Sequence, residues 1–424
     1  MKNPARSFSS VSIRHLVSFG LSAPFRHSAP FPFLVLILLA IFLFASASFD
    51  AASAATRKVP SEYKTIQRAI DAAAAGDTIL VGPGLYKENL ILRVSASLIG
   101  TRGAAKTIID GGGRASVLTC EGLDSTATIK GFTFRNGVGL EGGGMLLSNA
   151  FPSVVENVFT ADSAVYGGAL CALWSNSIIR NNKFVANRAQ YGAAIYTMLL
   201  APTIESNVVE NNVAKIGGAF YFGKSSEVKV IKNTLANNEA TETGGAIFCG
   251  KAIPTMDSNV FKTNKAHEGG AIYSFHCSGI IKGNLFLENV ALRGGAMAFA
   301  DTMAPDIRNN TIVRNSSPDS LCAGMYFSSS YSNVTNNIIA SNSPGYAIYC
   351  VAGGAPVLSC NILWENRTGN YSGVESNIED IYEDPQFCAP GKGDFSVKGN
   401  SPALTKPCGA IGAYGKGCGK GPGS

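Results

Sequence analysis

The sequence has few of the residues that most often build metal and redox sites. Charged residues make up only 15% of its 424 residues. His267 and His276 are the only histidines beyond the N-terminal region, and no two cysteines have the C-x-x-C spacing of zinc ribbons and thioredoxin-type motifs. We therefore predict no metal site and no cofactor. The near balance of 35 basic and 29 acidic residues also argues against a nucleic-acid or membrane-surface partner.

Long apolar runs are absent except for one near the N-terminus. This run, Phe31 to Phe44, is shorter than the roughly 20 residues that a membrane-spanning helix needs. It follows Arg14 and Arg26 and precedes a segment of small residues, which together indicate an export signal cleaved near Ala54. No cysteine precedes Cys120, so a lipid-attachment cysteine after the signal is absent. We expect a secreted or cell-surface protein with no membrane span after cleavage.

All ten cysteines lie in the part of the chain that follows the expected cleavage site. An exported protein meets conditions in which disulfides persist. The Gly- and Pro-rich tail with Cys388, Cys408 and Cys418 is the segment where we most expect a disulfide, although the spacing leaves the pairing open.

A repeat of about 25 residues dominates the middle of the chain. Its first motif is a glycine pair followed by a small and an apolar residue, as in GGAI at 244–247 and 269–272. Its second motif, N-x-(apolar)-x-x-N, keeps the same spacing over nine copies from Asn157 to Asn361. Because short apolar runs alternate with Gly and Asn turns, the repeat predicts a parallel β-coil whose turns stack at about 4.8 Å.

Each repeated residue type has a structural reason. Asparagines in one column can hydrogen-bond along the axis of the coil, and paired glycines permit a positive φ or a close backbone approach. The apolar residue that ends the glycine motif is expected to face inward. These inward residues are Leu170, Ile195, Phe220, Ile247, Ile272 and Met297.

The repeats resemble right-handed parallel β-helix proteins of the pectin-lyase-like superfamily. The pairing of F-x-x-N with GGA-(apolar) looks more narrowly like the repeats of polymorphic outer-membrane proteins, which implies a surface setting and no chemistry. The segment 63–92 resembles the N-terminal cap of pectin methylesterases, with an amphipathic helix expected over Ile66 to Ala73, but the catalytic signatures of those esterases are absent. Residues 383–415 are similar to the choice-of-anchor Q module, and we expect a C-terminal cap or anchor-like module there.

Five polar residues next to the glycine pairs are weak candidates for catalysis. They are Lys215, Glu242, His267, Glu268 and Arg293, and they fall on neighbouring turns. Such a patch could supply an acid–base pair or bind an anionic sugar. A solvated corner of opposite charges is the other interpretation. The acidic ladder that a calcium-dependent polysaccharide lyase would need does not occur in the repeats.

An aromatic column is the strongest candidate for ligand binding. The residue after the inward position is aromatic in six turns, at Tyr196, Tyr221, Phe248, Tyr273, Tyr326 and Tyr349. Strand alternation places it on the face opposite the inward column. If that face is the surface, the column suits stacking against sugar rings. If the alternation is the other way, the same residues form an interior stack. Cross-strand aromatic pairs also stabilise sheets without any ligand.

The sequence as a whole predicts an all-β protein, a single-stranded right-handed parallel β-helix with an N-terminal α-helical cap. The expected segments are a signal peptide (1–55), an N-terminal cap with the first coils (56–129), the β-helix repeats (130–382) and the C-terminal module (383–424). We expect an exported, non-catalytic monomer that binds a polysaccharide or a cell-surface partner along one face. A polysaccharide lyase or glycoside hydrolase is the alternative, and a structural spacer or adhesin segment is the third possibility.

Overall fold

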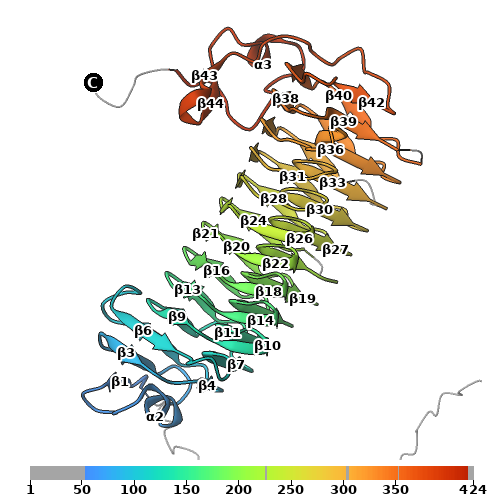
Figure 1. Cartoon of the computed structure of the whole chain (residues 1–424). Coiled ribbons are helices and arrows are strands. Elements are labelled where there is room, and N and C mark those ends of the chain that lie inside the picture. Colours follow the sequence, from blue (N-terminus) through green and yellow to red (C-terminus); the bar gives the residue numbers. More distant parts are fainter. Residues whose placement is uncertain (1–52, 225–226, 302–304, 352, 419–424) are drawn as a thin grey trace, which may run out of the picture. The chain divides into compact units, whose positions relative to one another are not determined.

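A computed structural model describes residues 53–418 except 225–226, 302–304 and 352. All but the last three residues of the expected signal peptide therefore lie outside the described part of the chain. From Ala54 onward the chain forms one compact unit, and its strands wind into a long coil (Figure 1).

Three long sheets run along the coil, and successive turns contribute one strand to each of them. The first sheet contains β1 (Thr56–Val59), β2 (Thr78–Val81), β5 (Ser97–Gly100), β8 (Thr128–Lys130), β12 (Ser153–Val155), β16 (Ile178–Arg180), β20 (Thr203–Glu205), β24 (Lys229–Ile231), β28 (Thr255–Asp257), β31 (Ile280–Lys282), β34 (Asp306–Arg308), β37 (Asn333–Thr335) and β40 (Val357–Ser359).

The second sheet contains β3 (Gly84–Tyr86), β6 (Thr107–Asp110), β9 (Thr133–Arg135), β13 (Val158–Thr160), β17 (Lys183–Val185), β21 (Val208–Glu210), β25 (Thr234–Ala236), β29 (Val260–Lys262), β32 (Leu285–Leu287), β35 (Thr311–Val313), β38 (Ile338–Ala340) and β41 (Ile362–Trp364). A shorter sheet follows it in the path of five turns. It contains β10 (Val138–Glu141), β14 (Ser163–Tyr166), β18 (Arg188–Tyr191), β22 (Val213–Ile216) and β26 (Glu239–Thr243).

The third long sheet contains β4 (Leu90–Leu92), β7 (Leu118–Glu121), β11 (Met145–Ser148), β15 (Leu170–Leu173), β19 (Ile195–Met198), β23 (Phe220–Phe222), β27 (Ile247–Gly250), β30 (Ile272–Phe275), β33 (Met297–Ala300), β36 (Cys322–Ser328), β39 (Tyr346–Cys350) and β42 (Tyr371–Ser372). Strands one turn apart pair in parallel, as Leu170 with Ile195 and Phe159 with Phe184 do. The predicted parallel β-helix is thereby confirmed. It begins earlier than the repeat suggests, because β2, β5 and β8 pair in the first sheet although no asparagine motif precedes Asn157.

The interior of the coil is filled by stacked apolar columns. All six residues of the predicted inward column are fully buried. On the second sheet, Phe134, Phe159 and Phe184 stack with ring centroids 5.1 and 4.9 Å apart. Burial of each such side chain contributes roughly 1.5–3 kcal/mol. The repeated apolar positions therefore supply most of the free energy that stabilises the β-helix.

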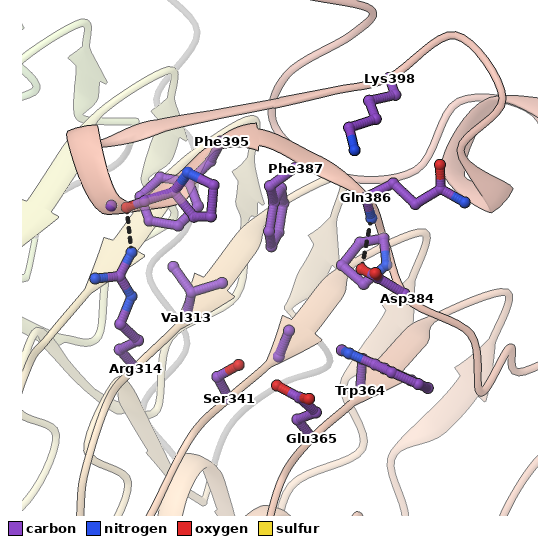
Figure 2. A pocket seen from close by; sticks show the side chains of 14 residues that line it. Val313, Arg314, Ser341, Trp364, Glu365, Asp384, Gln386, Phe387, Phe395 and Lys398 are labelled. Atoms are coloured by element: carbon purple, nitrogen blue, oxygen red, sulfur yellow. Dashed lines mark hydrogen bonds between the residues drawn. The ribbon is translucent and has the colours of Figure 1, made fainter.

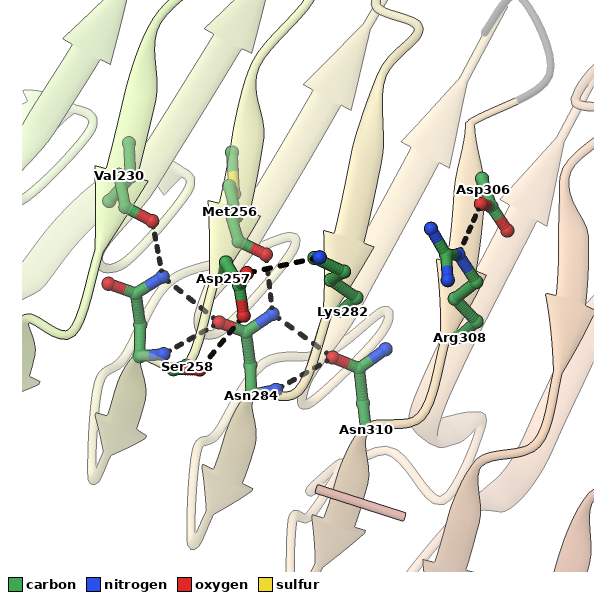
Figure 3. A network of polar contacts seen from close by, with 10 residues as sticks. Val230, Met256, Asp257, Ser258, Lys282, Asn284, Asp306, Arg308 and Asn310 are labelled. Carbon is green, nitrogen blue, oxygen red and sulfur yellow. Dashed lines mark hydrogen bonds and ion pairs between the residues drawn. The ribbon is translucent and has the colours of Figure 1, made fainter. Parts of the chain in front are cut away.

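Two asparagine ladders close the corners on either side of the second sheet. Asn284 is representative, because its Nδ2 donates to the Met256 carbonyl at 2.9 Å and to the Asn310 Oδ1 at 3.0 Å (Figure 3). Its backbone N–H donates to the same Oδ1 at 3.0 Å. The second ladder runs from Asp162 through Asn264 to Asn366. Buried turn groups are thus paired along the axis, as the sequence predicts.

The glycine pairs form the corner between the shorter sheet and the third sheet. Gly244 has a φ of +68°, and a Cβ at Gly245 would lie 2.1 Å from the Gly270 carbonyl oxygen of the next turn. Both expected reasons for glycine therefore operate at adjacent positions. The second position is less strict, because Ala193 occupies it in one turn.

A short helix, α2 (Ile66–Asp71), packs against the first turn and buries Ile66, Ala69 and Ile70. It ends two residues before the predicted boundary. Thr65 caps its N-terminus, and the Glu88 carboxylate accepts the backbone N–H groups of Ile66 and Gln67 at 3.0 Å. Glu88, which ends the sequence GLYKE at 84–88, thus supplies a carboxylate to the start of this helix, where the exposed N–H groups favour an anion.

The C-terminal module folds back along the side of the last turns. It contains the antiparallel pair β43 (Phe387–Ala389) and β44 (Asp394–Val397), the 3-10 turn η1 (Pro390–Lys392) and the helix α3 (Pro402–Thr405). Phe395, Val397, Ala403 and Ile411 form an apolar cluster with the outward side chains of β32, β35, β38 and β41. The module therefore covers an outer face of the coil and is more than a cap on its open end.

Three disulfides occur in the described part of the chain. Cys388–Cys418 lies within the C-terminal module, and Cys360–Cys408 joins that module to the coil. Both involve the tail cysteines where we expected a disulfide. The third, Cys249–Cys277, links successive turns of the coil.

Candidate functional site

The polar residues proposed from the sequence divide into two ion pairs. Lys215 Nζ lies 3.2 Å from Glu242 Oε1, and Arg293 Nη1 lies 2.6 Å from Glu268 Oε1. The His267 side chain is exposed and makes no hydrogen bond or ion pair within the described residues. His276 is also exposed, but it lies at the other end of β30. Within residues 53–418, apart from the gaps, no group of three or more His, Cys, Asp or Glu side chains could hold a metal ion.

The aromatic column lies on the outer side of the third sheet, opposite the buried inward column. Its residues are nevertheless well covered: Tyr196 is only 5% exposed, and the others are half-buried. Burial raises the pKa of Tyr196, Tyr221, Tyr273 and Tyr326, so these phenols stay neutral over the physiological range.

The rings of the column stack on one another. The ring centroids of Tyr196 and Tyr221 are 5.0 Å apart, and those of Tyr221 and Phe248 are 4.8 Å apart, with ring planes within 16° of parallel. Tyr166 and Tyr191 of the shorter sheet form a second stack and contact the first across the glycine corner. Because neighbouring rings cover the ring faces, most of the column offers only ring edges and hydroxyls to a ligand. Sequence reasoning missed the contact between these two stacks, although an aromatic residue before a glycine pair is its signal.

The column is interrupted at Ala298, which pairs with Tyr273 on one side and Tyr326 on the other. Tyr273 stacks on Phe248 and Tyr326 stacks on Tyr349, at 5.8 Å in both cases. The remaining face of each tyrosine therefore points toward the turn that carries Ala298. Glu268 lies on the turn that carries Tyr273, and its ion-pair partner Arg293 lies on the turn that carries Ala298.

A cleft of about 460 Å³ separates the coil from the C-terminal module. Its floor consists of the last residue of β35, β38 and β41 and the positive-φ corner residue that follows each strand. These three pairs are Val313–Arg314, Ala340–Ser341 and Trp364–Glu365. Because the pairs stand in register on successive turns, the floor is rigid and its groups are spaced by about 4.8 Å.

The roof of the cleft is the start of the C-terminal module. Phe387, Phe395 and Lys398 face the floor from above (Figure 2). Arg314 fixes one end, because its guanidinium donates to the Pro390 carbonyl and lies 5.2 Å from the centre of the Phe395 ring. Nη1 of the same guanidinium also lies 3.4 Å from Glu288 Oε1. Arg314 is thus occupied in holding the roof.

The other end of the cleft holds polar groups that have no partner. In the described part of the chain, the side chains of Trp364, Glu365, Gln386 and Lys398 form no hydrogen bond or ion pair. They supply an indole face and N–H, a carboxylate, an amide and an ammonium group. A volume in the range of small-molecule sites and polar groups along the lining make this cleft a candidate binding site, in which Glu365 and Lys398 are exposed to solvent. Sequence reasoning missed it, because the roof folds back against strands far away in the sequence and no motif records that contact.

The fold and its repeats place the chain in a known structural class, the parallel β-helices. A family model described as "Right handed beta helix region" matches residues 106–249 and 232–363. The chain belongs to this family. No curated protein sequence matches the chain.

Solved structures with similar coils include two polysaccharide-degrading enzymes. The catalytic unit of a GH87 alpha-1,3-glucanase from Streptomyces thermodiastaticus is similar over 78% of this chain and 70% of its own, at 12% identity and a TM-score of 0.45. The PL6 family alginate lyase AlyGC is similar over 85% of this chain and 59% of its own, at 15% identity and a TM-score of 0.41. At these scores neither activity transfers to the present chain.

Proposed function

We propose that the protein is an exported, non-catalytic β-helix that binds carbohydrate in the cleft beneath its C-terminal module. The main support for this proposal is that the half-buried rings of Trp364 and Phe387 line the same cleft as three polar side chains without a hydrogen-bond partner among the described residues. These are Glu365, Gln386 and Lys398. Sugar rings present apolar C–H faces and many hydroxyls. An aromatic surface flanked by both donors and acceptors matches that chemistry.

A surface or extracellular setting supports this role. The three disulfides support this setting, because disulfides form and persist in oxidising compartments. The resemblance of the repeats to polymorphic outer-membrane proteins, and of the tail to choice-of-anchor Q modules, supports the same setting. No helix in the described ranges is long and apolar enough to cross a membrane. We propose a monomer whose partner is a polysaccharide or a glycan-bearing surface.

The aromatic column is a secondary candidate for the same ligand. Its ring faces are mostly covered by their neighbours, so a sugar would contact edges and hydroxyls, except at the break beside Ala298. The enzymatic alternative has two cleft carboxylates, Glu365 and Asp384. Both carboxylates are exposed to solvent, which is not the desolvated environment that tunes a catalytic acid, and we therefore favour binding over hydrolysis.

The chain contains only two tryptophans, which permits a direct test. In a Trp174→Phe background, Trp364 is the only indole, and its emission reports on the cleft. The protein is first screened on an array of neutral and uronate-containing glycans, and each hit is then titrated by Trp364 fluorescence. We expect a saturable emission change. In isothermal titration calorimetry, which needs no indole reporter, Trp364→Ala should weaken binding by about tenfold or more, equivalent to about 1.4 kcal/mol.

Trp174→Ala is the matched control, since Trp174 is a 51% exposed corner residue on another part of the coil. It should leave affinity unchanged. A double variant, Tyr221→Ala/Tyr273→Ala, distinguishes the cleft from the aromatic column. If this variant loses binding and Trp364→Ala does not, the binding site lies on the aromatic column. Release of reducing ends or unsaturated products from a bound glycan would establish the enzymatic alternative. Absence of any glycan hit would refute the proposal.

A further inference from the structure

The first residues of the described chain form a polar cluster that the proposed function does not use. Asp77 precedes β2 and is only 4% exposed. Its Oδ1 accepts the backbone N–H of Ala55 at 2.7 Å. Its Oδ2 accepts the backbone N–H of Ala74 at 2.9 Å and the guanidinium of Arg57 at 2.8 Å.

Ala55 is held in place by the first sheet as well. Its carbonyl accepts the Thr78 N–H at 2.9 Å, one residue before β1 begins. Ala55 is also the residue that follows Ala52-Ser53-Ala54, the small-x-small sequence expected at a signal cleavage site. The residue fixed by Asp77 and the residue that would become the new N-terminus are therefore the same.

We propose that an export-associated peptidase cleaves between Ala54 and Ala55, and that the α-ammonium group it releases forms an ion pair with the Asp77 carboxylate. In the cleavage step, water adds across the Ala54–Ala55 amide bond. Ala54 leaves as a carboxylate, and the nitrogen of Ala55 takes up protons to become an ammonium group at neutral pH.

The nitrogen that gains the charge already lies at hydrogen-bonding distance from Oδ1. Cleavage therefore replaces a hydrogen bond from a neutral amide by an ion pair with a charged ammonium group, and the backbone does not need to move. Arg57 does not compete for that oxygen, because its Nε and Nη2 both donate to Oδ2 and its Nη1 donates to the Tyr63 hydroxyl at 2.9 Å. Processing would thus strengthen a contact that already holds the first strand on the coil.

Two measurements test the proposal, and neither depends on carbohydrate binding. In the first, the full chain is expressed in a secretion host and the N-terminus of the exported protein is determined by mass spectrometry. We expect Ala55. A mature chain that starts at any other residue would overturn the proposal.

In the second measurement, a chain that starts at Ala55 is compared with one that retains Ser53 and Ala54. We expect a midpoint of thermal unfolding higher by about 2–4 °C for the chain that starts at Ala55. Asp77→Asn should abolish this difference between the two lengths. An equal midpoint for both lengths, or a difference that persists in Asp77→Asn, would mean that Asp77 only closes the local turn.

If Asp77→Asn does not fold, the reactivity of the α-amine gives the same answer in the unmodified sequence. An amine held as an ammonium ion by a carboxylate is acylated more slowly, and one pKa unit corresponds to about tenfold in rate. We expect the Ala55 amine to react at least tenfold more slowly in the folded protein than in urea. Equal rates would contradict the ion pair.

Discussion

Asp162 is the one acidic residue in the second asparagine ladder, and its replacement by asparagine should stabilise the protein. Asp162 is 1% exposed, and its Oδ1 accepts the Gly137 N–H at 2.8 Å. Its Oδ2 has no hydrogen-bond partner. In the next turn, the corresponding atom is the Asn187 Nδ2, which donates to the Phe159 carbonyl at 3.2 Å and to the Asn212 Oδ1 at 3.0 Å.

The size and pH dependence of the effect follow from this geometry. An unpaired buried polar group costs about 1–3 kcal/mol, so Asp162→Asn should raise the free energy of unfolding by about that amount at pH 7. Burial, with a smaller contribution from Asp110, raises the pKa of Asp162 well above its ordinary value of 3.8. The folded chain therefore keeps a proton that the unfolded chain releases, and its stability falls as the pH rises from 3.8 toward the folded-state pKa.

Urea denaturation followed by far-UV circular dichroism at pH 3 and pH 7 measures both effects. The gain from Asp162→Asn should be small at pH 3 and largest at pH 7. Asn264→Asp is the matched control, because Asn264 is a fully buried member of the same ladder, and its loss of stability should grow with pH. A less stable Asp162→Asn protein at pH 7, or an equal gain at both pH values, would refute the reasoning.

Two further predictions concern the corners and cross-links of the coil. Gly244→Ala should cost about 1–3 kcal/mol, because φ is +68° and the new Cβ would lie 2.4 Å from the Ile247 carbonyl oxygen. Gly245→Ala should also destabilise the protein, because its Cβ would lie 2.1 Å from the Gly270 carbonyl oxygen, and an unchanged urea midpoint for either variant would contradict the assignment. Replacing Cys249 and Cys277 together by serine should lower stability by about 2–4 kcal/mol. The loss should vanish when parent and variant are compared under reducing conditions.

The periodic part of the fold could be predicted from the sequence because each turn repeats the same physical problem. Every turn must bury one apolar residue after the glycine corner and must pair the polar groups of its bends. The same residue types therefore recur at the same spacing, and the inward column and the asparagine ladders follow directly. The early turns before Asn157 solve the same problem with other residues, and no count of the motif could have included them.

The candidate cleft could not be predicted because nothing repeats in it. Trp364 and Glu365 look like the end of one more turn, and Phe387 looks like part of a separate tail. Their meeting depends on apolar outward residues such as Leu285 and Ile338, which the module covers. In earlier turns the same column holds both polar and apolar residues, such as Lys183 and Val208. The apolar outward residues were the available signal, and they become informative only once the inward and outward positions of each strand are known.

Ala298 interrupts the aromatic column between Tyr273 and Tyr326. A substitution at this position can therefore separate the structural role of the column from a role in binding. If the column only stabilises the third sheet, Ala298→Tyr should complete the stack between Tyr273 and Tyr326. The gain should be about 0.5–1.5 kcal/mol for each new ring pair, measured as a higher urea midpoint with unchanged glycan affinity. If the break holds part of the ligand, the same substitution should place a new ring between Tyr273 and Tyr326 and weaken binding while the protein becomes no less stable. Because only the affinity differs between the two roles, the binding of this variant to a glycan that binds the parent protein assigns the column.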